Sequence, residues 1–173
     1  MPKVNLYPDF KGLLELLNSE KVKYLIVGGY AVIHYGFRRA TKDLDVWIAV
    51  DAENSKRVSR VMQEFAGYSA SDVKPSMFQQ KGRIFAFGRE PVRVDLLTDP
   101  DAVDFEECYA RRIVVTWDGV DVPLISIEDL RKNKAGSGRP KDLADLENLP
   151  PAAPTTEAKP SRRKPTKRKR RGA

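Results

Sequence analysis

Two aspartates, Asp43 and Asp45, stand two positions apart in a stretch that alternates polar and apolar residues. Residues two apart on a β-strand share one face, so both carboxylates point the same way while Leu44 and Val46 point to the other. Two carboxylates this close repel each other unless one is protonated or a cation lies between them. Carboxylate oxygens suit Mg²⁺, which adds water and substrate phosphates to its shell. The pair therefore indicates a magnesium site, and the alternative is a strand end whose acids are only solvated.

A glycine pair, Gly28-Gly29, lies between a short apolar run and a segment typical of a helix. The N–H groups at a helix start attract anions, and glycine lets a phosphate approach the backbone closely. The alternative is a tight turn without a ligand. The pair is neither a Walker A loop, since no Gly-Lys-Ser/Thr follows, nor a dinucleotide fingerprint.

The spacing of these two motifs resembles the signature of the DNA polymerase β-like nucleotidyltransferase superfamily. Val-Gly-Gly at 27–29 is followed, after thirteen residues, by Asp-Leu-Asp-Val at 43–46. Arg39 and Thr41 ahead of these aspartates also match the Arg-x-Thr-x-Asp-x-Asp run of many minimal bacterial members. The resemblance implies that a nucleoside triphosphate binds at Gly28, Gly29, Arg39 and Thr41.

The superfamily pattern has a third carboxylate on a later strand, and Asp95 matches it. Apolar residues alternate along 92–98, which places Asp95 in the middle of a predicted strand. The alternative is an exposed strand residue paired with Arg93. Asp99, Asp101 and Asp104 are rivals, but a Pro-containing loop is a poorer place for a fixed ligand.

A fourth stretch resembles the Lys…Arg-x-Lys-Asp-x-x-Asp ending of small nucleotidyltransferases, including those of toxin–antitoxin and abortive-infection systems. Here it runs from Lys134 through Arg139, Lys141 and Asp142 to Asp145. By that resemblance Lys134 and Lys141 bind phosphate, and Asp142 anchors the loop. The alternative is a capped, charged surface helix.

The resemblance implies a reaction in which a hydroxyl of an unidentified acceptor attacks the α-phosphorus of the triphosphate and pyrophosphate leaves. Asp43, Asp45 and Asp95 are then both the Mg²⁺ ligands and the catalytic residues, and Asp95 accepts the hydroxyl proton. The identity of the triphosphate, ATP or another, is left open. Two other classes also stay open: a non-catalytic antitoxin or partner subunit of nucleotidyltransferase fold, which would bind a protein partner, and a nucleic-acid-binding adaptor.

The elements that position these residues form an expected α/β (α+β) fold, a mixed β-sheet flanked by helices. Helices are predicted over 9–20, 30–35, 52–65, 127–134 and 141–149, with helical periodicity in the first and third. Strands are predicted over 23–27, 43–50, 83–88, 92–98, 112–117 and 120–125. Asp118-Gly119 signals a hairpin, Ser126 with Asp129 a variant of the capping box, and 66–82 stay ambiguous.

Charge divides the chain at residue 150. Residues 150–173 hold nine Lys/Arg, one acid and five prolines, whereas residues 1–149 hold 22 basic and 23 acidic groups. We expect a nucleotidyltransferase-like domain over 1–149 and a disordered tail over 150–173, because the tail has too little apolar surface to offset the cost of ordering. The tail either binds nucleic acid through phosphate neutralisation or is solvated without a partner.

The remaining composition narrows the class of protein. Cys108 is the single cysteine, which excludes an intrachain disulfide and gives no support to a zinc cluster. The N-terminus lacks a signal-peptide pattern, and no apolar run is long enough to span a bilayer. We therefore expect a cytoplasmic protein without a membrane partner.

Overall fold

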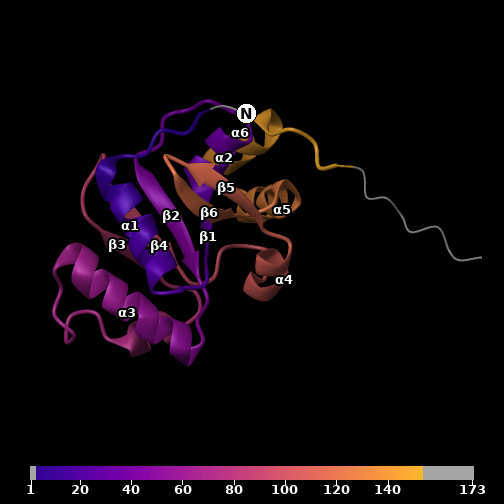
Figure 1. Cartoon of the computed structure of the whole chain (residues 1–173). Coiled ribbons are helices and arrows are strands. Elements are labelled where there is room, and N and C mark those ends of the chain that lie inside the picture. The colour runs from indigo at the N-terminus through magenta and orange to yellow at the C-terminus, as the bar shows by residue number, and fades with distance from the viewer. Residues whose placement is uncertain (1–2, 154–173) are drawn as a thin grey trace, which may run out of the picture.

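The structure is a computed structural model that describes residues 3–153. A mixed six-stranded sheet lies among helices, so the predicted α/β class is confirmed (Figure 1). The predicted disordered tail lies outside the described residues from 154 onward, and 150–153 are exposed and belong to no helix or strand. In the described part of the chain, no helix combines the length and apolar character that crossing a membrane requires.

Each predicted helix and strand has a counterpart whose ends differ by a few residues. The helices are α1 Pro8–Ser19, α2 Gly28–His34, α3 Ala52–Ala66, α4 Phe105–Ala110, α5 Ile127–Ser137 and α6 Pro140–Asn148, with a 3-10 helix η1 Pro75–Gln79. The strands are β1 Tyr24–Val27, β2 Asp43–Ile48, β3 Ile84–Phe87, β4 Arg93–Leu97, β5 Ile113–Trp117 and β6 Val120–Leu124. Helix α4 was not predicted, and η1 lies in the ambiguous segment.

The order of the strands brings the motifs together. The sheet runs β3-β4-β2-β1-β6-β5, and β2 is parallel to β4 but antiparallel to β1. This register places Asp45 beside Asp95 on one side and beside Val27 on the other. Because Gly28 follows Val27 directly, the glycine pair also meets the acidic pair.

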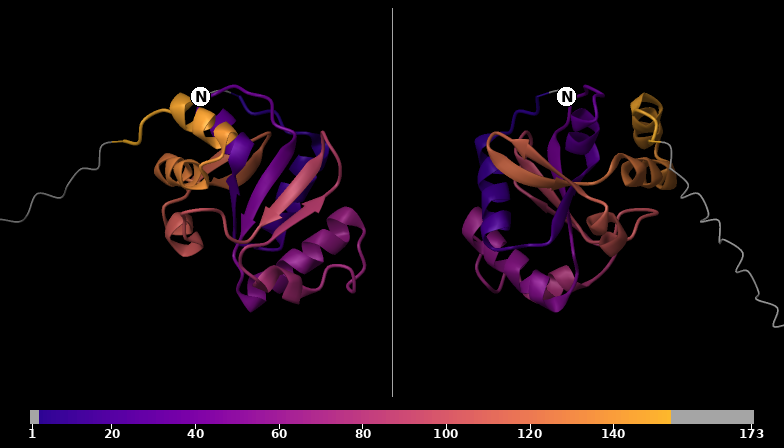
Figure 2. Two further views of the ribbon diagram at one scale, coloured as in Figure 1. Left: turned by 180° about the vertical axis from the view of Figure 1, so that it is seen from behind. Right: turned by 45° about the vertical axis from the view of Figure 1, so that its right-hand side comes forward.

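The two faces of the sheet have different covers. Helices α1 and α3 lie on one side, and α4, α5 and α6 lie on the other (Figures 1 and 2). Trp47, which shares a strand face with Asp45, packs edge to face on Phe105 of α4 with ring centroids 5.2 Å apart. The carboxylates therefore belong to the face that carries α4, α5 and α6, while the alternate residues of β2 are buried on the other face.

Local chemistry explains where several elements begin and turn. Ser126 caps α5, since its hydroxyl accepts a hydrogen bond from the Asp129 N–H at 3.2 Å, as predicted. Asp104 caps α4 in the same way, accepting from the Glu107 N–H at 3.1 Å. The hairpin between β5 and β6 has positive φ at both Asp118 (48°) and Gly119 (84°), which a turn of type I′ requires.

Candidate active site

Three carboxylates converge on the face of the sheet that carries α4, α5 and α6. Asp43 and Asp45 extend from β2 and Asp95 from β4, and one oxygen of each lies within 4.8 Å of the others. Asp95 is only 7% exposed, and the other two are half-buried. The structure thus brings together the three aspartates that the sequence singled out.

The charge of this cluster is only partly neutralised by its surroundings. Burial raises the pKa of Asp45 to about 7, and the charges of Asp43 and Asp95 add to the rise. Lys134 and the Gly29 N–H lower the pKa of Asp45, but by less. Three hard oxygen donors with uncompensated negative charge suit a divalent cation such as Mg²⁺, so the residues present fit the ion that the sequence implies.

Asp95 is also paired with an arginine, which was the alternative interpretation of this residue. Arg93 donates from Nε to Oδ1 at 2.8 Å and from Nη2 to Oδ2 at 3.0 Å. Burial raises the pKa of Asp95 above its usual range even though Arg93 lowers it. Because an ionised carboxylate has about four acceptor sites, this fork fixes the orientation of Asp95 and leaves sites for a cation. Asp95 is therefore buried, paired and part of the cluster at once.

The two glycines are required by close contacts within the chain itself. Gly28 has φ +65°, and a Cβ there would collide with Oδ2 of Asp45. A Cβ on Gly29 would collide with Oγ1 of Thr41. The missing side chains therefore make room for Asp45 and Thr41, where the sequence had predicted room for a phosphate. The hydroxyl of Thr41 donates to the Asp43 carbonyl at 3.2 Å and so helps to fix the start of β2.

A cavity of about 500 Å³ opens beside the three carboxylates. Eight of the nine site residues predicted from the sequence line it, and Thr41, which contacts Gly29, is the exception. The lining contains these acids together with three predicted phosphate-binding cations, Arg39, Lys134 and Lys141. Its lining also includes cations and an amide to which the sequence assigned no binding role: Arg83, Arg139 and Asn133. Acids and cations that line one cavity suit a metal-bound polyphosphate.

Two of these cations, Arg39 and Lys134, are held by acids of α6. Arg39 Nε lies 2.7 Å from Asp145 Oδ1, and Lys134 Nζ lies 3.0 Å from Asp145 Oδ2. Lys134 also donates to Asp142 at 2.6 Å and is only 5% exposed. Lys134 is thus a buried, paired lysine, where the sequence had predicted only a phosphate ligand. Asp142 does anchor the loop as expected, because it also accepts from Arg139 at 2.8 Å.

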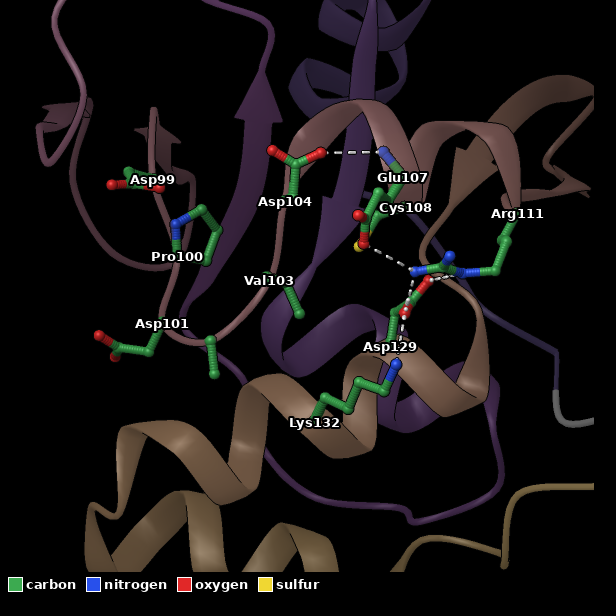
Figure 3. A pocket seen from close by; sticks show the side chains of 11 residues that line it. Asp99, Pro100, Asp101, Val103, Asp104, Glu107, Cys108, Arg111, Asp129 and Lys132 are labelled. Carbon is green, nitrogen blue, oxygen red and sulfur yellow. Dashed lines mark hydrogen bonds and ion pairs between the residues drawn. The ribbon is translucent and has the colours of Figure 1, made fainter.

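A second cavity, also of about 500 Å³, lies between α4, α5 and the loop that precedes α4 (Figure 3). In Figure 3, Arg111 reaches from the end of α4 to Asp129 of α5 and donates two hydrogen bonds, at 3.0 and 2.9 Å. Burial raises the pKa of Asp129, but hydrogen bonds from Arg111 and Ser126 outweigh it and leave that pKa below its usual value. The buried acid of this cavity already has its cation, unlike Asp45. We therefore place the candidate site at the first cavity.

The fold is that of nucleotidyltransferases. A presumed nucleotidyltransferase from Thermotoga maritima is 18% identical over 80% of this chain and 88% of its own, with a TM-score of 0.52. An antigenic nucleotidyltransferase-like protein from Paracoccidioides brasiliensis is 20% identical over 79% and 71%, with a TM-score of 0.51. A lincosamide antibiotic adenylyltransferase with bound lincomycin is 17% identical over 84% and 98%, also with a TM-score of 0.51.

A comparison of the sequence with protein-family models identifies the family. A family model described as nucleotidyltransferase of unknown function (DUF6036) matches residues 9–150, and the chain belongs to that family. No curated protein sequence matches the chain significantly. The resemblance inferred from the glycine and aspartate motifs is thereby confirmed at the level of the nucleotidyltransferases, and a toxin–antitoxin type stays a prediction.

Proposed function

We propose that this protein is a Mg²⁺-dependent nucleotidyltransferase that transfers a nucleoside monophosphate from a nucleoside triphosphate to an acceptor hydroxyl and releases pyrophosphate. The observation that carries the proposal is the convergence of Asp43, Asp45 and Asp95 within 4.8 Å at the wall of a cavity that also has a cationic part. Membership of a nucleotidyltransferase family supports it.

Each part of the wall has a role in this proposal. Asp43 and Asp45 hold the ion that carries the triphosphate, and Asp95 holds a second ion. Arg39, Lys134 and Lys141 face the phosphates, and the backbone of Gly28 and Gly29 lies beside the β- and γ-phosphates. Thr41 packs against Gly29 and fixes the start of β2.

In the chemical step, the acceptor oxygen forms a bond to the α-phosphorus as the bond from that phosphorus to the pyrophosphate oxygen breaks. The hydroxyl proton goes to the carboxylate of Asp95, which Arg93 holds in a fixed orientation. Bound Mg²⁺ supplies charge stabilisation to the attacking and leaving oxygens. The residues of the site contribute mainly positioning and fixed charges, as in phosphoryl transfer generally.

Binding of Mg²⁺ with each of the four nucleoside triphosphates, measured by calorimetry, tests the first half of the proposal. We expect Asp43→Asn and Asp45→Asn each to weaken binding by about tenfold or more, because each removes a charged oxygen ligand. Asp99→Asn and Asp101→Asn, loop acids at the rim of the same cavity, should bind like the wild type. Undiminished affinity in both triad variants would remove the proposed metal site.

Label transfer tests the second half. The protein is incubated with each α-labelled triphosphate, Mg²⁺ and total cell RNA or protein, and labelled products are separated. Wild-type labelling that is lost in Asp43→Asn supports the enzyme. Binding of a triphosphate without labelling of any acceptor would instead favour the non-catalytic antitoxin or partner subunit of the same fold.

A further inference from the structure

We propose that Asp145 is a positioning residue that holds Arg39 and Lys134 as a preformed cationic wall for the phosphates of the nucleotide. This inference rests on the proposed function and assigns a task to a residue of α6 that does not line the cavity itself. It also names the part of the ligand that the wall recognises, which is the polyphosphate group.

Asp145 joins three segments that are far apart in sequence. Its side chain is 1% exposed, it accepts a hydrogen bond from Arg39 Nη2 at 3.0 Å, and Arg39 Nε forms an ion pair with it at 2.7 Å. It also lies 3.0 Å from Nζ of Lys134 in α5. One buried carboxylate therefore fixes a cation of the loop before β2 and a cation of α5 relative to each other.

Both cations point from Asp145 toward the candidate site. Nη2 of Arg39 lies 3.3 Å from the place where a Cβ on Gly29 would be, and the charge of Lys134 lowers the pKa of Asp45. Both side chains also line the cavity of about 500 Å³. Charges fixed in advance need no reorganisation when an anion arrives, which makes them more effective than mobile surface lysines.

Arg39 and Lys134 still have N–H donors that can bind a phosphate. A lysine ammonium has three N–H donors; Lys134 donates one to Asp142 and forms an ion pair with Asp145. Of the four Nη N–H donors of Arg39, one goes to Asp145 and one to the Ala40 carbonyl, while Nε forms an ion pair with Asp145. One donor of Lys134 and two of Arg39 are left for a ligand. The acid pairs thus orient the cations without saturating them.

A purely structural role is the competing explanation, and the molecule contains a matched pair for comparison. Asp129 is as buried as Asp145 and accepts two hydrogen bonds from Arg111, but Arg111 does not line the cavity beside the triad, whereas Arg39 does. Removing either acid leaves an arginine without its buried partner, so both changes should lower stability. Only the loss of Asp145 should change nucleotide binding.

The test is calorimetry in Mg²⁺ with the best-bound nucleoside triphosphate and with its monophosphate. We expect Asp145→Asn to weaken triphosphate binding by about tenfold or more and monophosphate binding much less. Asp129→Asn should lose melting temperature to a similar degree while keeping its triphosphate affinity. Equal or tighter triphosphate binding by Asp145→Asn would overturn the inference, because Asp145 would then only compete with the anion.

Arg39→Lys is a second test of the inference that remains valid if Asp145→Asn does not fold. Lysine keeps the charge but cannot reproduce the two-pronged contact with Asp145, so triphosphate affinity should fall although the chain stays folded. Wild-type affinity in Arg39→Lys would overturn the positional requirement. If the wild type binds no triphosphate, both the proposed function and this inference are wrong. If the wild type binds triphosphate and both variants bind it equally well, only this inference is wrong.

Discussion

At the scale of single residues, the chemistry of the site depends on what surrounds each acid. Asp95 and Asp129 are both buried aspartates that accept two hydrogen bonds from one arginine. The pKa of Asp95 is nevertheless raised, whereas that of Asp129 is lowered. Burial raises both, and Asp43 adds a like charge only beside Asp95. An acid that keeps excess negative charge despite an arginine partner is one that can still attract a cation.

This contrast gives a prediction for Asp95. Asp95→Asn should lower nucleotidyl transfer by about a hundredfold or more while triphosphate binding stays within about tenfold, because a second-metal ligand or proton acceptor acts mostly in the transition state. Steady-state kinetics with an identified acceptor, beside calorimetry, measures the two effects. Asp129→Asn is the control and should transfer at the wild-type rate. If Asp95→Asn transfers at the wild-type rate, Asp95 has only a structural role as the partner of Arg93.

Sequence reasoning found Asp43, Asp45 and Asp95 because their signal is local. Alternation with apolar neighbours places such residues on one face of a strand, and the superfamily spacing indicates which strands belong together. The pairing of Arg39 with Asp145 spans 106 positions and leaves no local pattern. The contacts of the glycines likewise leave no local pattern, since only the folded chain shows that Asp45 and Thr41 occupy the space beside them.

At the scale of elements, α5 and α6 act as one unit that supports the cationic wall. The helices lie side by side (Figure 2), and Asp142 at the start of α6 is bound by Lys134 and Ser137 of α5. Burial raises the pKa of Asp142, but the hydrogen bonds from Lys134 and Ser137 and the charges of Lys134 and Arg139 outweigh it and lower the pKa to about 2. The ionised form of Asp142 therefore stabilises the packing of the two helices.

The pH dependence follows from the sign of that shift. A depressed folded-state pKa gives stability that is fully present above the unfolded value near 4 and is lost as pH falls toward about 2. Asp142→Asn should therefore cost about 2 kcal/mol of unfolding free energy at neutral pH and much less near pH 2 to 3. Urea denaturation of both proteins at the two pH values measures this. An equal cost at both pH values would mean that the charge of Asp142 contributes nothing.

Element prediction succeeded where a short signal decides the conformation. Asp118-Gly119 sets the hairpin through positive φ angles, and Ser126 sets the start of α5 through its cap. Helix α4 was missed because it is six residues long and too short for periodicity to register. Its signal was present all the same, since Asp104 stands three residues before Glu107 and accepts a hydrogen bond from its N–H.

At the scale of the whole molecule, the domain that contains the candidate active site and the C-terminal segment that is proposed to bind nucleic acid differ in charge. Residues 1–149 are almost neutral with 22 basic and 23 acidic groups, and the nine basic groups of 150–173 follow them. A truncation a few residues beyond the predicted boundary at 149 keeps one more contact of the domain. Nη1 of Arg131 donates to the carbonyls of Leu146, Leu149 and Pro150, each at 3.2 Å, and Leu149 is buried. A cut after Ala153 keeps these contacts.

A chain that ends at Ala153 should therefore melt like the full chain and lose salt-sensitive affinity for nucleic acid. Binding through phosphate neutralisation weakens steeply with salt, so the full chain should bind a labelled single-stranded RNA much better at about 50 mM than at about 200 mM salt. Fluorescence anisotropy of both chains at the two salt concentrations measures this, and Mg²⁺–triphosphate binding serves as the control that the truncated domain keeps its site. Retained RNA affinity after truncation would place the contact surface within residues 1–153. Early melting of the truncated chain would show that residues beyond Ala153 stabilise the domain.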